Sequence, residues 1–596
     1  MTTNSQAIIG AALALAFLTA SSIGCARQVR RYSAEGPMWR DAGDFKPFGP
    51  VPEAYFSPFA WDAADNMIFR PLARIFAVDP GGEAVNVNSM DEVPDSSWFT
   101  NRLNRQRLSP ERIAQAACDD APLDPSGPWT ITSAKPDGAS PGFIIKDQQG
   151  RSFLLKFGDE NQRERATTAD VVGSIFYWAA GYEPPCNQIT FFRKDILQIG
   201  ENATATVYGK KVPLTWERLD PVFDLVSPQP DGTWRAAASR FLPGKPLGPW
   251  RYELVRDDDP NDVIPHDDRR ELRGAYVLAS WMNHFDSREQ NTLSMWITTD
   301  DHGRGYVRHH YIDFGDSFGS MWALRGMSER LGHTYYLDMP YVFQDLVTFG
   351  GIPRAWRGNE LGPTGNTFGY YNVETFQPDK YRTGYQNPAF IRATERDKAW
   401  MARIIANITP EAIEAAVARA KLSDPFVESE LLRIVLARRE KILQRWFRNL
   451  SPLAEPRLHE TESGTELCLR DLAVATGIVE PDARLYSKRG WRHVRRRKLR
   501  EVEVGAPRRG PNDTICVGLP NIDRASLDHP AYLIIDVNGL YGRDDDKSRP
   551  ARVHLYQFGK GDYLVVGLQR PYKLRTPSGL DQYYPRSLEM FALDLY

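Results

Sequence analysis

The sequence predicts an α+β fold in which β-rich segments flank a helical middle. Two short apolar runs, 143–145 and 153–155, are separated by the turn Asp147-Gln148-Gln149-Gly150, which is typical of a β-hairpin. Between residues 268 and 447, apolar residues recur mainly at helical spacing. Short apolar runs with turns return after about residue 463. Because strands precede helices and do not alternate with them, the order favours α+β over a doubly wound sheet.

The overall composition is that of an ordinary globular protein. Of 596 residues, 42% are hydrophobic and 25% are charged, which excludes a mainly disordered or fibrous chain. The 74 Lys and Arg residues nearly balance the 76 Asp and Glu residues, so the chain lacks the basic excess that nucleic-acid binding requires and we expect no nucleic-acid partner. Five cysteines are too few for a disulfide scaffold.

The first residues differ from this average. Residues 7–24 carry no charge, small residues dominate their second half, and Cys25 follows directly. The pattern resembles a bacterial lipoprotein leader, although the preceding MTTNSQ lacks Lys and Arg, and Ser22 replaces the usual Leu. The resemblance implies lipidation of Cys25, with residues 1–25 as leader, in a membrane-anchored lipoprotein of the cell envelope that faces the periplasm or the exterior. An ordinary secretory leader, which would give a secreted protein, and an uncleaved anchor stay open.

The rest of the chain divides into three parts. Residues 26–125 are rich in Pro and aromatic residues, with one helix near 110–117, and indicate an irregular arm that packs on the main domain. Residues 126–455 form this main domain, and residues 460–596 form a separate β-rich domain. Within the main domain we expect helices at 162–180, 268–283, 395–408, 410–420 and 429–447, and strands at 189–192 and 233–241. The first helix ends at Gly181, a C-cap residue.

Four cysteines remain if Cys25 carries lipid. An even number in an oxidising compartment permits disulfides. We expect Cys468 to pair with Cys516 within the last domain, while buried free thiols are the alternative for all four, including Cys118 and Cys186.

One stretch carries the residue types that phosphoryl transfer requires. Asp286 is followed five residues later by Asn291, and Asp313 opens an Asp-Phe-Gly sequence after an apolar strand. In such an arrangement one carboxylate accepts the proton of the attacking hydroxyl, while an Asn amide and a second carboxylate bind Mg²⁺.

Other parts of a phosphate site occur upstream in the right order. Lys156 ends a strand, and Gly138 and Gly142 belong to a turn before it that is suited to lie over phosphates. The next helix offers two acids, Asp170 and Glu164, as partners of the lysine.

Over residues 129–447 the chain resembles the atypical branches of the protein-kinase-like superfamily, which include lipid-kinase-like, HipA-like and secretory-pathway kinases. The resemblance implies a two-lobed domain with a β-rich N-lobe and a helical C-lobe. It also implies ATP and Mg²⁺ as cofactors. Lys156 would bind phosphates with Asp170 as its partner, Asp286 would be the catalytic base, and Asn291 and Asp313 the metal ligands. Residues 233–244 would lie beside the adenine.

Two functions from different classes are consistent with the resemblance. The first is an ATP-dependent kinase that acts on a hydroxyl of a protein, a sugar or a lipid. The second is a catalytically inactive kinase fold with a binding or structural role in the envelope, because Asp170 replaces the usual Glu and Asn283-His284-Phe285-Asp286 replaces His-Arg-Asp. ATP is also scarce outside the cytoplasm.

Three polar clusters are given smaller roles. The basic run 488–498 is either a contact for an anionic partner or a solvated β-ribbon. The acidic run 257–262 lacks the spacing of a calcium loop. His309 and His310 are adjacent on a strand and therefore face opposite sides, which argues against a shared zinc ion.

Overall fold

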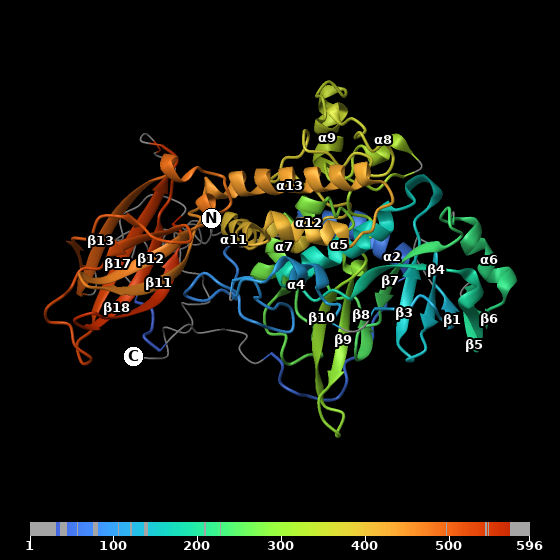
Figure 1. Ribbon diagram of the computed structural model, residues 1–596, viewed down its shortest axis with the longest axis horizontal. Coiled ribbons are helices and arrows are strands. Elements are labelled where there is room, and N and C mark those ends of the chain that lie inside the picture. Colours follow the sequence, from blue (N-terminus) through green and yellow to red (C-terminus); the bar gives the residue numbers. More distant parts are fainter. Residues whose placement is uncertain are drawn as a thin grey trace, which may run out of the picture.

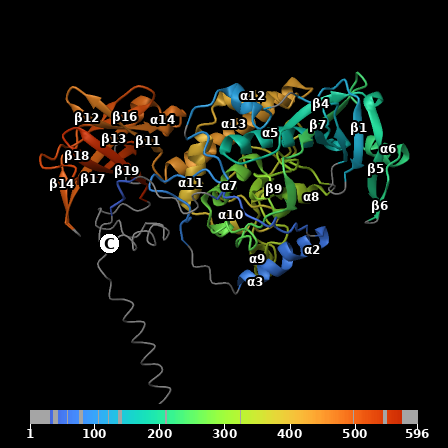
Figure 2. The same cartoon turned by 90° about the horizontal axis from the view of Figure 1, so that it is seen from below.

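The computed structural model confirms a mixed α and β fold with several sheets. It describes residues 31–35, 44–56, 58–75, 82–104, 106–119, 122–135, 141–207, 210–226, 228–322, 324–495, 498–542, 545 and 548–571. Figures 1 and 2 show a β region at each end of the molecule and the long helices between them. Within these ranges, no helix has the length and apolar character needed to cross a bilayer.

A seven-stranded sheet forms the first β region, in the order β4-β7-β3-β2-β1-β5-β6. The predicted hairpin is its centre, where β2 (Gly142–Lys146) pairs antiparallel with β3 (Ser152–Lys156). Alternate residues of these strands are buried in a core against helix α6 (Trp216–Asp224). The remaining strands are β1 (Trp129–Ala134), β4 (Asn187–Phe192), β5 (Leu197–Val207), β6 (Lys210–Pro213) and β7 (Trp234–Arg240).

Helix α5 (Arg165–Ala180) begins three residues after its predicted start. Residues Glu160–Gln162 form a separate 3₁₀ turn capped by the side chain of Asp159, which displaces the start of the helix. The helix ends at Gly181 as expected, with φ of 117°. Glycine is required there because a Cβ would lie 2.2 Å from the ring of Phe99.

The predicted helices of the middle region are confirmed. Each of the last three begins after a side-chain cap: Thr394 before α11, Thr409 before α12 and Asp424 before α13. Because Asp424 and Pro425 are strong start signals, α13 begins four residues before the predicted 429. The confirmed helices are α7 (Arg270–Met282), α11 (Glu395–Ala406), α12 (Pro410–Ala418) and α13 (Pro425–Phe447). The short helix α10 (Pro388–Arg392) was not predicted.

A three-stranded sheet lies beside these helices, in the order β10-β9-β8. Only the strand before Asp313 was expected from the sequence. Strand β8 is Lys245–Gly248, β9 is Thr292–Thr298 and β10 is Gly305–Tyr311. The chain then runs through the short helices α8 (Arg325–Ser328) and α9 (Met339–Thr348), which were not predicted.

The arm packs on the rest of the molecule, as expected. Its Asp91 carboxylate is buried among the guanidinium groups of Arg270, Arg403 and Arg570, at 2.5 to 2.8 Å. The predicted helix near 110–117 is α4 (Pro110–Gln115). The arm is more helical than expected, because α2 (Phe59–Ala64), a π-helical segment (Asp65–Phe69) and α3 (Arg70–Ile75) form a continuous helical stretch.

Two sheets pack together in the C-terminal β region. A four-stranded sheet has the order β11-β12-β16-β15, and a five-stranded sheet has the order β14-β13-β17-β18-β19. The predicted runs 532–535 and 563–566 fall in β17 and β19. The strands of the two sheets are β11 (Leu453–Thr461), β12 (Gly464–Asp471), β13 (Leu485–Arg495), β14 (Lys498–Val502), β15 (Arg508–Arg509), β16 (Thr514–Gly518), β17 (Ala531–Leu540), β18 (Ala551–Gly559) and β19 (Asp562–Gln569).

The basic run lies on the β13–β14 hairpin. Within its described part, Arg489 is exposed and lies 3.5 Å from Glu501, whereas Trp491 is buried. The side chains of 495–497 lie outside the described residues.

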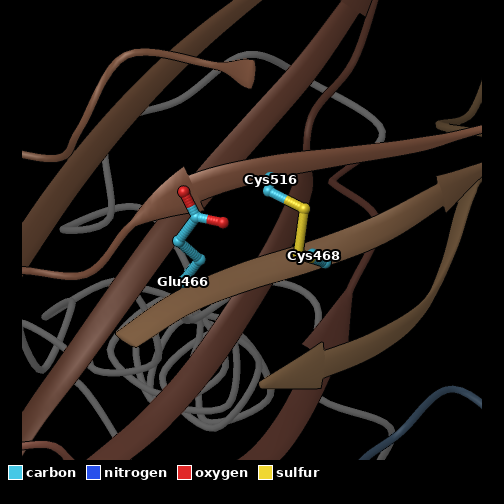
Figure 3. Close-up of side chains that lie close together, drawn as sticks. All are labelled: Glu466, Cys468 and Cys516. Carbon is cyan, nitrogen blue, oxygen red and sulfur yellow. A yellow bond between two sulfur atoms is a disulfide. The ribbon is translucent and has the colours of Figure 1, made fainter. Parts of the chain in front are cut away.

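Two disulfides form, which contradicts the free-thiol alternative. Cys468 bonds to Cys516 as expected, and Cys118 bonds to Cys186. Cys468 and Cys516 are direct partners across β12 and β16. Glu466 lies near both sulfurs, as Figure 3 shows, but sulfurs bonded to each other are not the thiolates that bind a metal.

Removing the second disulfide tests its contribution. With a sequence separation of 48 between the cysteines, the chain-entropy relation predicts that Cys468→Ser with Cys516→Ser lowers stability by about 4 kcal/mol. Hydrogen exchange measured by mass spectrometry should become faster in peptides of 453–569. Cys118→Ser with Cys186→Ser is the control, since it should affect peptides around α4 and β4 instead. Unchanged exchange in 453–569 would contradict the prediction.

Candidate functional site

The side chain of Lys156 is the centre of a charged cluster built from three separate elements. Lys156 is the last residue of β3 and is only 8% exposed. Its Nζ lies 3.2 Å from Oδ2 of Asp170, on α5, and 2.7 Å from Oδ1 of Asp313, in the loop after β10. Residues 14 and 157 positions from Lys156 in the chain therefore meet at one ammonium group.

The position of α5 explains why Asp170 reaches this lysine. Gly173, one turn after Asp170, allows the helix to approach Phe314, because a Cβ there would lie 2.7 Å from the Cβ of Phe314. The ring of Phe314 is fully buried, and its backbone N–H donates to Oδ1 of Asp170 at 3.0 Å. The helix and the Asp-Phe-Gly loop thus fix each other.

The second acid considered for this role does not reach the lysine. Glu164 lies 3.6 Å from Arg235, and its Oε2 accepts a hydrogen bond from the hydroxyl of Ser423 at 3.0 Å. Of the two predicted partners, Asp170 is therefore the one in contact with Lys156.

Asp313 combines an unusual backbone with a strongly acidic side chain. Its φ is 56°, in the left-handed region, where non-glycine residues are uncommon and often functional. Desolvation disfavours its ionised form, but the charges of Lys156 and Lys135 outweigh this and hold the pKa of Asp313 well below its usual range. Its side chain is 45% exposed, so the carboxylate remains open to a further cation.

Asp286 and Asn291 lie in one loop and contact each other. Nδ2 of Asn291 donates to Oδ2 of Asp286 at 2.8 Å and to its backbone oxygen at 2.7 Å. Nε of Arg288 lies 3.0 Å from Oδ1 of Asp286. Burial raises the pKa of Asp286 to about 7, against the opposing charge of Arg288.

His284 packs behind the loop and contacts helix α5. It is fully buried, and its Nδ1 lies 3.0 Å from the hydroxyl of Tyr177 on α5. Burial lowers its pKa to about 4, so the ring is neutral near pH 7.

The predicted glycine turn is described only in part. Gly138 lies outside the described residues. Gly142 lies directly opposite Lys156 in the β2–β3 pair, and a Cβ there would lie 2.3 Å from the backbone oxygen of Leu155. The segment 233–244, which was predicted to lie beside the adenine, includes β7, and Ala237 of this strand pairs with Lys156.

A second lysine near this cluster was missed from the sequence. Lys135 follows β1, and its charge contributes to the low pKa of Asp313. Burial and the neighbouring charge of Lys156 lower the pKa of Lys135 itself. A signal was available in the sequence, because Lys135 directly follows the first strand of the sheet and precedes the predicted glycine turn.

The donor set fits Mg²⁺ and a triphosphate. Both contacts of the Asn291 amide nitrogen go to Asp286, which leaves its amide oxygen as the ligand atom, and the Asp313 carboxylate is partly open. Oxygen donors of this kind suit Mg²⁺, and two lysines supply charge for phosphates.

The remaining predicted clusters lie elsewhere and have partners of their own. Asp262 of the acidic run contacts His266 at 2.6 Å and Arg269 at 3.4 Å. The ring of His309 stacks on Trp98, with 3.4 Å between centroids, whereas Nδ1 of His310 lies 2.9 Å from the backbone oxygen of Glu183. The two histidine rings therefore contact different residues and do not face a common ligand position.

Comparison with solved structures finds a match of low similarity. The crystal structure of the Golgi casein kinase is similar to this chain with a TM-score of 0.21 and 12% sequence identity, over 66% of this chain and 98% of that one. No family model matches the chain. No curated protein matches it either.

Proposed function

We propose that this chain is a two-lobed, kinase-like phosphotransferase that uses ATP and Mg²⁺ and acts on a hydroxyl group. The observation that carries the proposal is the Lys156 ammonium group held between Asp170 and Asp313. The Asp286–Asn291 pair provides the remaining polar groups for this chemistry. The seven-stranded sheet supplies the lysine, helix α5 supplies Asp170, and the loop after β10 supplies Asp313.

Each residue has a distinct task in this proposal. Lys156 and Lys135 bind phosphate oxygens, and Asp170 keeps the ammonium of Lys156 in place. Asn291 and Asp313 are the residues that would hold Mg²⁺, which neutralises charge on the transferred phosphoryl group. Gly142 and Gly138 would let the backbone approach the phosphates.

Asp286 is the proposed general base. A base works best when its pKa lies near the working pH, because it is then often ionised and still holds a proton well. Burial gives Asp286 a pKa of about 7, which meets this condition. Its carboxylate would accept the proton of the attacking hydroxyl while Asn291 and Arg288 fix its orientation.

Turnover of ATP tests the proposal without knowledge of the acceptor, since water can replace the hydroxyl. The full-length protein, purified in detergent, should release labelled phosphate from γ-labelled ATP when Mg²⁺ is present. EDTA should abolish the release. If the protein neither turns over nor binds ATP, the non-enzymatic alternative, an envelope protein that keeps the fold for binding, is supported instead.

We also propose that the protein is anchored in the cell envelope through lipid on Cys25, which lies outside the described residues. Cys25→Ser should move the protein from the membrane fraction to the soluble fraction, because the substitution removes the thiol that would carry the lipid. Fractionation with immunodetection measures this, and Ser22→Ala is the matched control. Membrane association that persists in Cys25→Ser would contradict lipid anchoring.

A further inference from the structure

A cleft lies beside the loop that carries Asp286 and Asn291. It has a volume of about 680 Å³, within the range of ligand sites, and none of Lys156, Asp170 and Asp313 lines it. Its walls come from the arm, from the loop after β8 and from strands β9 and β10. Glu289 and Gln290 also line it, so the loop that carries Asp286 and Asn291 borders this cleft as well.

The cleft is strongly acidic. Seven carboxylates and three guanidinium groups line it. Arg70 forms ion pairs with two of these acids: its Nε lies 2.8 Å from Asp65 and its Nη1 lies 2.7 Å from Glu289. Arg256 forms an ion pair with Asp258 at 2.7 Å. Arg74 lies 3.4 Å from Glu253 and Arg288 lies 3.7 Å from Asp62, so five guanidinium groups in all face the seven carboxylates. The remaining excess of negative charge favours a cationic ligand.

Polar groups without partners mark the floor of this cleft. Among the described residues, the hydroxyl of Ser294 and Nε2 of His309 have no hydrogen-bond partner. The two residues are 0% and 3% exposed and lie opposite each other on β9 and β10. Buried polar atoms are normally satisfied, so these two indicate a ligand that donates and accepts hydrogen bonds, as a peptide backbone does.

Aromatic rings complete the walls. Tyr55 and Trp61 from the arm are 51% and 57% exposed, and Trp250 lies deeper, at 4%. Exposed rings beside carboxylates suit the flat guanidinium group of arginine or the stem of lysine, since both stack on aromatic faces.

A chain of charges joins this cleft to the candidate base. Arg288 lies 3.0 Å from Asp286 and 3.7 Å from Asp62, which lines the cleft. A ligand held in the cleft is therefore adjacent to the loop that would perform the chemistry.

We infer that this acidic cleft binds a basic segment of a polypeptide, with Lys or Arg side chains among its carboxylates. Together with the proposed function, on which this step rests, the inference names a basic protein as the phosphoryl acceptor. The hydroxyl of Ser294 and the ring of His309 would contact the peptide backbone.

Direct binding of a peptide tests the cleft independently of ATP. A fluorescein-labelled peptide rich in Lys, Arg and Ser, mixed with the full-length protein in detergent, should raise fluorescence anisotropy at low salt. Binding should weaken as salt increases. A peptide with Glu in place of Lys and Arg should not bind.

Variants locate the bound peptide. Glu53→Gln with Asp257→Asn removes two carboxylates on exposed residues of the cleft and should weaken binding by roughly threefold to fivefold for each charge. Glu460→Gln with Glu462→Gln, exposed in the C-terminal β region, is the control and should change nothing. Ser294→Ala should also weaken binding.

The possible results separate this inference from the proposed function. Equal binding by the cleft variant and the control variant, or no binding of the basic peptide, would overturn the inference whether or not ATP binds. Binding of a neutral oligosaccharide that is lost in Trp61→Ala, without binding of the peptide, would overturn it in favour of a sugar site. Peptide binding in the cleft without ATP turnover would support the cleft and contradict phosphoryl transfer.

Discussion

Asp286→Asn is expected to abolish ATP turnover while making the folded protein more stable above pH 7. Removal of a general base costs roughly 100-fold to 10,000-fold in rate. The amide is nearly the same size as the carboxylate and can still accept the hydrogen bond that Asn291 donates. Activity should therefore fall without a loss of structure.

The gain in stability results from the sign of the pKa shift. Burial raises the pKa of Asp286 from 3.8 to about 7, so the folded state binds this proton more tightly than the unfolded state does. The resulting stabilisation is complete below about pH 4 and is lost as pH rises through about 7. An amide does not ionise and so does not lose this stabilisation. The melting temperatures of the variant and the unmodified protein should therefore be equal near pH 4, and that of the variant should be higher near pH 8.5.

Thermal melting at several pH values, combined with ATP turnover, checks both halves of this prediction. Asp301→Asn, on an exposed residue of the β9–β10 connection, is the matched control and should change neither quantity. The rate for the unmodified protein should rise with pH through about 7, because the base must be ionised. Full activity in Asp286→Asn would exclude Asp286 as the base, and a variant that melts lower at every pH would assign it a structural role.

Lys156→Met should remove nucleotide binding and also destabilise the fold. The substitution leaves Asp170, which is buried, and Asp313 without their shared counter-ion. Breaking a buried ion pair typically costs about 3–5 kcal/mol, and the lower end applies here because Asp313 is partly exposed. Denaturant unfolding measures the stability, and displacement of a fluorescent ATP analogue measures the binding.

A second substitution separates the two effects of this lysine. Lys156→Met with Asp170→Asn removes the buried charge along with the ammonium group, so stability should largely return. Nucleotide binding should stay absent, because no cation remains at the end of β3. Recovery of binding in the double variant would show that Lys156 acts on the fold alone.

Local patterns in the sequence were enough to predict the elements around the site. Two apolar runs around a turn predict the β2–β3 hairpin that ends at Lys156, and Thr394 and Thr409 cap the helices that follow them. The order of Lys156, Asp286, Asn291 and Asp313 was also predictable, because each residue type has a separate role in phosphoryl transfer.

Features that depend on distant contacts could not be predicted in this way. Glu164 and Asp170 are six residues apart, so they face different sides of the helical segment, and only packing decides which one meets Lys156. The helical stretch of the arm was missed because Trp61 and Phe69 are exposed, so its pattern lacks a buried stripe.

Binding of Mg·ATP to the full-length protein is the most direct test of the Lys156–Asp313 cluster. A ligand that binds only the folded state raises the melting temperature, and the shift grows with ligand concentration. We predict a rising shift with Mg·ATP in the unmodified protein, no shift with EDTA, and no shift in Asp313→Ala at any concentration. A melting temperature that stays unchanged up to millimolar Mg·ATP, or an equal shift in Asp313→Ala, would contradict nucleotide binding at this site.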